Sequence, residues 1–218
     1  MNVIEIALLA VATFIFAIDQ FSLTELIYRP IIACPIIGAI LGDFNTGLVV
    51  GGTYELMMVG NMPVGGAQPP NAVLGGIVAM VFAVESGFTV EEALGASVIF
   101  AVFGQYVVTL TFTTMSAFMA KADKAAEEAN PKGIAQVNYI SMAILGCLFA
   151  VLAVVAYVGG TAMAAPLQAF SENFSWFMGG LGAAGGMMRY VGFGILLKIM
   201  LANDMWGIYF AGSLLLQY

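Results

Sequence analysis

Residues 51–71, GGTYELMMVGNMPVGGAQPPN, place four polar side chains among prolines and glycines in an otherwise apolar chain: Glu55, Asn61, Gln68 and Asn71. One carboxylate and three amides accept and donate hydrogen bonds, which suits a neutral polyhydroxylated ligand better than an ion. Asp19 offers a second carboxylate. A carboxylate at membrane depth costs at least about 2.5 to 3.5 kcal/mol, so its presence indicates a function. We therefore predict a substrate site formed by Asp19, Glu55, Asn61, Gln68 and Asn71.

The two carboxylates also have other interpretations. Asp19 could mark a helix terminus at the membrane surface, and Glu55 could form a structural ion pair with Arg29 or Arg189. If Asp19 and Glu55 lie close together, they could instead bind a cation or carry a proton. Sugar binding and ion binding therefore both remain open on these residues alone.

The amides have a structural alternative of their own. Asn61, Gln68 and Asn71 could cap the ends of broken helices, because short polar side chains accept hydrogen bonds from unpaired backbone amides. Asp43 and Asn45 occupy a GDFNTG sequence, which favours a turn over a ligand site.

The amino-acid composition indicates whether this chain lies in water or in a membrane. Of its 218 residues, 61% are hydrophobic and only 9% charged, and the mean hydropathy is +0.99. An average soluble domain has about 25% charged residues, so these values indicate an integral membrane protein. At about 20 residues per spanning helix, the chain has room for roughly six to eight helices or half-helices. We predict a single membrane domain over residues 1–218, all-α and polytopic, with broken or re-entrant helices.

Several function classes are excluded by what the sequence lacks. It contains no histidine, which removes the commonest metal ligand and general base, and with them any phosphohistidine on this chain. Thirteen acids and six bases give a net charge of −7 and do not suggest nucleic-acid binding. No sequence pattern of a hydrolase, nucleotide-binding loop or zinc site occurs. We expect no catalytic residue, cofactor or metal site of its own.

The first third of the chain predicts interrupted helices. Residues 1–18 form an apolar helix without the basic start or cleavage site of a signal peptide. Within residues 30–50, Pro35, Gly38 and the turn at 42–47 leave about a dozen apolar residues, too few to cross, so a re-entrant hairpin or half-helix is expected. The prolines and glycines of residues 51–71 must break the helix there, in the way that many transporters form a substrate site.

The remaining chain predicts full spans. We expect a helix at residues 72–84, spans at 93–120, 134–165 and 176–202, and a short final piece at 205–218.

The distribution of Lys and Arg predicts which ends of these spans face the cytoplasm. The segment 121–133 carries three of the six Lys and Arg residues, so it is predicted to be a cytoplasmic loop. The acidic turn at 85–92 and a turn at 166–175 should lie outside.

Residues 29–76 resemble the signature region of a known family, the IIC membrane component of the mannose/fructose/sorbose family of the bacterial phosphoenolpyruvate-dependent sugar phosphotransferase system. The matching pieces are Arg-Pro at 29–30, LGDFNTG at 41–47, GGTYE at 51–55 and GAQPPN at 66–71. KADKAAEE at 121–128 and GLGAAGGMM at 180–188 are also similar to that family. These pieces occur in the family's order and spacing and cover nearly the whole chain.

The resemblance implies uptake of a hexose or amino sugar across the bacterial inner membrane with phosphorylation on release. It implies a IID membrane subunit as partner, cytoplasmic IIA and IIB phosphoryl carriers, and trimers of IIC–IID pairs. GAQPPN looks closer to the N-acetylgalactosamine and galactosamine members than to the mannose members. Family members usually run several tens of residues further than Tyr218.

Two alternatives to this function remain at the level of sequence. One is an autonomous sugar transporter driven by protons or sodium through Asp19 and Glu55. The other is a scaffolding subunit whose partner holds the substrate site.

Overall fold

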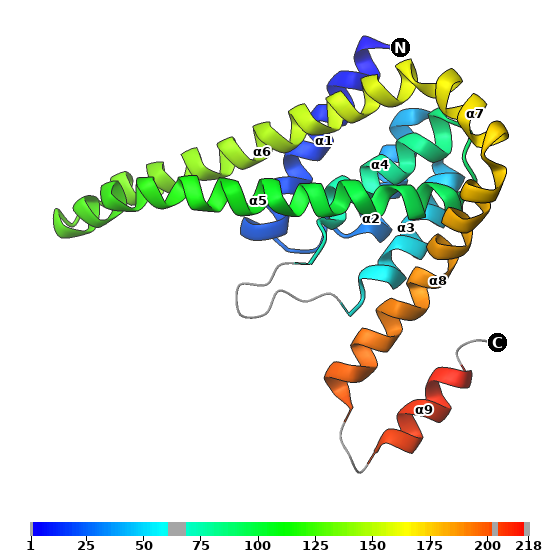
Figure 1. The fold of residues 1–218 in the computed structure, drawn as a ribbon. Coiled ribbons are helices and arrows are strands. Elements are labelled where there is room, and N and C mark those ends of the chain that lie inside the picture. Colours follow the sequence, from blue (N-terminus) through cyan, green and yellow to red (C-terminus); the bar gives the residue numbers. More distant parts are fainter. Residues whose placement is uncertain (1, 61–68, 202–204, 216–218) are drawn as a thin grey trace.

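The computed structural model describes residues 2–60, 69–201 and 205–215, and in these ranges every regular element is a helix (Figure 1). The helices are α1 (Val3–Ser22), α2 (Pro30–Leu41), α3 (Phe44–Met58), α4 (Ala72–Glu85), α5 (Val90–Glu127), α6 (Pro131–Ala162), α7 (Ala164–Asn173), α8 (Ser175–Met200) and α9 (Trp206–Leu215). The predicted all-α class is confirmed.

Four of these helices, α1, α5, α6 and α8, are long and apolar enough to cross a membrane. Helix α5 has 38 residues, which at 1.5 Å per residue is about 57 Å and exceeds the roughly 30 Å hydrocarbon thickness. Figure 1 shows α5 and α6 as a long antiparallel hairpin whose tip projects away from the other helices. The chain is therefore a multi-pass helical membrane protein.

The predicted interruption of the first third is confirmed. Helices α2, α3 and α4 have 12, 15 and 14 residues, about 18 to 22 Å, and none of them is long enough to cross alone. Helix α2 ends at Gly42, whose φ of +87° is a left-handed conformation that favours glycine. Asp43 then begins α3 by accepting hydrogen bonds from the Thr46 amide at 3.0 Å and hydroxyl at 2.6 Å. The GDFNTG sequence is thus a turn only at Gly42 and Asp43, and its last four residues form the first turn of α3.

Helix α4 lies at the centre of the fold. Every residue from Ala72 to Val81 is buried, and the helix contacts α2, α3, α5 and α6. Side chains from all sides complete this core, among them Leu9 of α1, Tyr54 of α3 and Phe149 of α6. Because α4 begins inside the protein at Ala72, its first amides need hydrogen-bond partners other than water.

Two predicted loops are helices instead. The segment 121–133 continues α5 to Glu127, and α6 starts after a short turn at Pro131, because alanine, lysine and glutamate are strong helix formers. Asn130 caps α6 by accepting from the Gly133 amide at 3.2 Å. The predicted turn at 166–175 is largely α7, whose Pro166 lies in the first helical turn, where the missing amide has no intrahelical partner.

The hairpin of α2 and α3 depends on close approach of the two backbones. A Cβ added at Gly51 would lie 2.6 Å from the Pro30 carbonyl oxygen and 3.1 Å from the Pro35 ring. By contrast, a Cβ at the neighbouring Gly52 would meet no atom within 4 Å. Gly51 therefore permits the contact that joins the two short helices, and Gly52 does not take part in it.

We expect Gly51→Ala to destabilise the protein by about 1 to 3 kcal/mol, because the methyl group would push against backbone that cannot move away. Gly52→Ala is the matched control and should be neutral or stabilising by up to about 1 kcal/mol, as for glycine in an open helical position. Thermal unfolding of the purified proteins in one detergent measures both. Equal effects of the two substitutions would contradict the packing described here.

Candidate functional site: a polar cavity where the short helices end

A cavity of about 480 Å³ lies where α1 and α3 end and α4 begins, with the middle of α5 on one side. Its volume is in the range of small-molecule sites. Phe21, Pro30, Met58 and Val59 contribute apolar surface. The polar and charged residues of its lining are Gln20, Glu25, Tyr28, Arg29, Glu55, Asn71 and Gln105. A mixture of amides, carboxylates and aromatic rings can bind both the hydroxyl groups and the apolar faces of a sugar.

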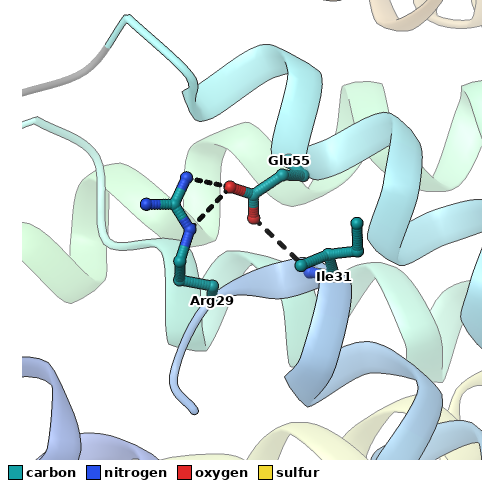
Figure 2. Close-up of polar contacts among 3 residues, drawn as sticks. All are labelled: Arg29, Ile31 and Glu55. Carbon is teal, nitrogen blue, oxygen red and sulfur yellow. Dashed lines mark hydrogen bonds and ion pairs between the residues drawn. The ribbon is translucent and has the colours of Figure 1, made fainter. Parts of the chain in front are cut away.

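Glu55 reaches the cavity from the last turn of α3 and pairs with Arg29 (Figure 2). Its Oε1 accepts from Arg29 Nε at 2.7 Å and from Arg29 Nη2, and its Oε2 accepts from the Ile31 amide at 3.5 Å. The pair therefore places a carboxylate at the amino end of α2, where the helix dipole favours negative charge. The alternative interpretation of Glu55, an ion pair, is confirmed with Arg29, whereas Arg189 donates to the Gly186 carbonyl of its own helix at 3.1 Å.

The guanidinium of Arg29 stays charged. The hydrogen bond to Glu55 raises the pKa of Arg29 above its already high ordinary value, against the opposing effect of burial. The Arg29 side chain is 41% exposed and that of Glu55 is 14% exposed. Both side chains thus line the cavity and keep part of their surface accessible to a ligand.

Asp19 does not belong to the cavity lining. It is fully buried in the last turn of α1, and its carboxylate accepts four hydrogen bonds from the segment 24–28. The donors are Thr24 N at 2.8 Å, Thr24 Oγ1 at 2.6 Å, Leu26 N at 3.1 Å and Tyr28 N at 3.0 Å. The alternative interpretation, a position at a helix terminus, therefore describes Asp19 better than a place in the cavity lining. Its neighbour Gln20 lines the cavity in its place.

Asn71 lines the cavity and also fixes the start of α4. Its Oδ1 accepts from the Leu74 amide at 3.0 Å, its Nδ2 donates to Gln20 Oε1 at 3.0 Å, and its backbone amide donates to the Ala101 carbonyl at 2.8 Å. The capping interpretation is confirmed for Asn71, which joins α1, α4 and α5 at one point. Asn61 and Gln68 lie outside the residues that the structure describes.

Five polar or charged lining residues were not selected as ligands from the sequence: Gln20, Glu25, Tyr28, Arg29 and Gln105. Arg29 was considered only as an ion-pair partner of Glu55. Gln105 could have been found by the rule that identified Glu55, since it is a polar side chain within a long apolar span. Gln20 follows Asp19 directly. Glu25 and Tyr28 gave no signal, because an exposed polar patch between helices is expected without any function.

A second hollow, of about 450 Å³, lies on the outer face of α6 at residues 132–143. Its lining is almost entirely apolar, and the ring of Tyr139 is 69% exposed beside it. It offers few hydrogen-bonding groups to a sugar, so the cavity around Glu55 and Asn71 is the better candidate site.

Comparison with known proteins gives a consistent result. The family model described as the PTS system sorbose-specific IIC component matches residues 3–218. The N-acetylgalactosamine permease IIC component 1 of Escherichia coli K12 is 37% identical over 96% of this chain and 78% of the relative. The sorbose-specific EIIC component of Klebsiella pneumoniae is 32% identical over 94% of this chain and 78% of the relative.

Two solved structures also resemble the fold. One, described only as a membrane protein, has a TM-score of 0.90 at 25% identity. The match covers all of this chain and 88% of the chain in that structure. The other is the mannose transporter ManYZ in complex with microcin E492, with a TM-score of 0.70 at 26% identity over the same shares of the two chains.

A double-mutant cycle tests the ion pair at the cavity. We expect Arg29→Gln and Glu55→Gln to be coupled by about 1 to 3 kcal/mol in the free energy of unfolding, since charged hydrogen bonds in partly buried positions exceed typical surface pairs. Equilibrium unfolding in mixed micelles measures this coupling.

The cycle of Arg189→Gln with Glu55→Gln serves as the control. Because Arg189 bonds within its own helix, its coupling to Glu55 should be within about 0.5 kcal/mol of zero. Coupling of Glu55 to Arg189 as strong as that to Arg29 would refute the pairing seen here.

Proposed function

The chain belongs to the family of PTS sorbose-specific IIC components, and from this premise we propose that the cavity lined by Glu55 and Asn71 holds the sugar during uptake. The observation that carries the proposal is the Arg29–Glu55 pair at the wall of a 480 Å³ cavity that also contains three amides. As a family member with four long apolar helices, the chain is a multi-pass protein of the bacterial inner membrane. It acts in sugar uptake by the phosphotransferase system.

The proposed ligand is a neutral or amino hexose. Glu55 and Arg29 neutralise each other, so the paired groups favour hydroxyl groups over a strongly charged ligand. The amide side chains of Gln20, Asn71 and Gln105 add donors and acceptors from three different helices. Similarity to the N-acetylgalactosamine permease component supports an amino sugar of that type as the first substrate to try.

The proposal also includes the other residues that the sequence predicted: Asn61, Gln68 and Asp19. Asn61 and Gln68 are proposed as further ligands on their sequence position alone. Asp19 is proposed to contribute through the segment that its carboxylate holds. We further propose that residues 1–218 act as one membrane domain.

Partners follow from the family. We propose that a IID membrane subunit joins this chain, that IIA and IIB carriers deliver the phosphoryl group, and that IIC–IID pairs assemble as trimers. Similarity to the chain in the ManYZ complex supports the IID partner. The absence of histidine fits a subunit that binds sugar without carrying the phosphoryl group. An autonomous ion-coupled transporter receives no support from relatives that are phosphotransferase components.

The chemical form of the imported sugar tests this function. Cells that express this chain with a IID partner and the soluble carriers should convert labelled N-acetylgalactosamine or galactosamine to the sugar phosphate on entry. Cells that lack any one of these components should accumulate neither free sugar nor phosphate above background. Accumulation of free sugar by this chain alone would replace the proposal with the ion-coupled transporter.

A further inference from the structure

Glu25 has a backbone conformation that its side chain disfavours. Its φ is +55°, and Ala129 with +49° is the other non-glycine residue with positive φ in the part of the chain that the structure describes. Left-handed backbone is uncommon for residues with a Cβ, and glutamate has no special tolerance for it. Such a conformation persists only where surrounding contacts enforce it, and these places are often functional.

The contacts that enforce it come from Asp19. The buried carboxylate accepts from Thr24 on one side of Glu25 and from Leu26 and Tyr28 on the other. If Glu25 relaxed to an ordinary φ, these donors would move away and leave a buried charge without partners, which is strongly unfavourable. The four hydrogen bonds on Asp19 therefore fix the segment in one shape.

This shape places Glu25 on the wall of the cavity, together with Arg29 and Glu55. Glu55 is occupied by Arg29 and the Ile31 amide. Glu25, in contrast, is exposed and has no hydrogen bond or ion pair with any other described residue. It is thus the cavity carboxylate whose oxygens are free to accept from a ligand.

We propose that Glu25 is a substrate-binding residue of this cavity and that Asp19 is the positioning residue that holds it there. This inference rests on the proposed function, since the ligand is taken to be the transported sugar. The carboxylate of Glu25 accepts hydrogen bonds from hydroxyl groups of the sugar, or from its amino group in an amino sugar.

The same charge discriminates between substrate and product. A phosphate ester carries about −1.5 to −2 charges at neutral pH and is repelled by a nearby carboxylate. Glu25 therefore favours the unphosphorylated sugar and promotes release of the sugar phosphate.

Glycine at this position separates backbone strain from ligand binding. Glu25→Gly removes both the carboxylate and the energetic cost of the positive φ. Ala129→Gly removes the same backbone cost at the turn between α5 and α6, outside the cavity lining. Both should leave the thermal unfolding temperature unchanged or higher. Only Glu25→Gly should weaken binding of labelled N-acetylgalactosamine, mannose or sorbose, by about ten- to a hundredfold for whichever sugar binds the IIC–IID complex.

Glu25→Gln tests the charge. It should weaken sugar binding to a similar degree and raise the affinity for the corresponding sugar phosphate relative to the sugar. If the wild-type complex binds a sugar and both Glu25 variants bind it equally well, Glu25 is not a ligand and the proposed function still stands. If the wild-type complex binds none of these sugars, the proposed function fails and this inference fails with it.

A pair of threonine variants tests the positioning role of Asp19. Thr24→Val and Thr46→Val each remove a 2.6 Å hydrogen bond from a threonine hydroxyl to an aspartate, Asp19 in one case and Asp43 in the other. Only Thr24→Val should lower sugar affinity, by a few-fold, without lowering the maximal rate of phosphorylation. Unchanged affinity in Thr24→Val, or the same loss in Thr46→Val, would overturn the positioning role.

Discussion

Helices α2, α3 and α4, in the first third of the described chain, are too short to cross the bilayer, so the backbone groups at their ends must find partners inside the protein. Unpaired amides cost several kcal/mol in apolar surroundings, and no water is available to satisfy them at that depth. Asp43 accepts from one amide in the first turn of α3, Asn71 from one in the first turn of α4, and Glu55 from one at the start of α2. The polar side chains that make these hydrogen bonds therefore lie where helices end.

The candidate site is a consequence of this constraint. Groups recruited to satisfy helix ends converge at the junction of α1, α3 and α4, and their unused donors and acceptors face one cavity. Asn71 illustrates the double use, because it caps α4, holds Gln20 and still lines the cavity. A preorganised polar wall of this kind loses little freedom when a sugar binds. In the proposed function, the residues that stabilise the helix ends are also those that bind the sugar.

Asp19 extends the same principle to the segment between α1 and α2. A buried carboxylate is stable here because four donors of that segment surround it. In return, the segment acquires one fixed conformation that no regular helix would give it. Glu25 and Arg29 belong to this segment, and both line the cavity. Asp19 is not part of the lining, but by holding the segment it determines which charged groups the cavity contains.

Sequence reasoning predicted the features that depend on residue type and spacing. Prolines and glycines identified the broken first third, long apolar runs identified α1, α5, α6 and α8, and Glu55 was selected as a ligand and does line the cavity. The loop between α5 and α6 was predicted to be too long, at residues 121–133. Its charged residues suggested a loop, but the alanines and glutamates extend α5 to Glu127. Glu25 could not be found at all, since its φ is set by hydrogen bonds to a residue in another element.

The central claim is that sugar binds in the cavity between α1, α3, α4 and α5, and photoaffinity labelling tests it most directly. A diazirine derivative of N-acetylgalactosamine would be activated on the IIC–IID complex and the labelled peptides sequenced. The account predicts label on residues 20–29 and on the peptide that contains Gln105, removed by excess unmodified sugar. Displaceable label on residues 132–143 of α6, with none at the cavity, would contradict it.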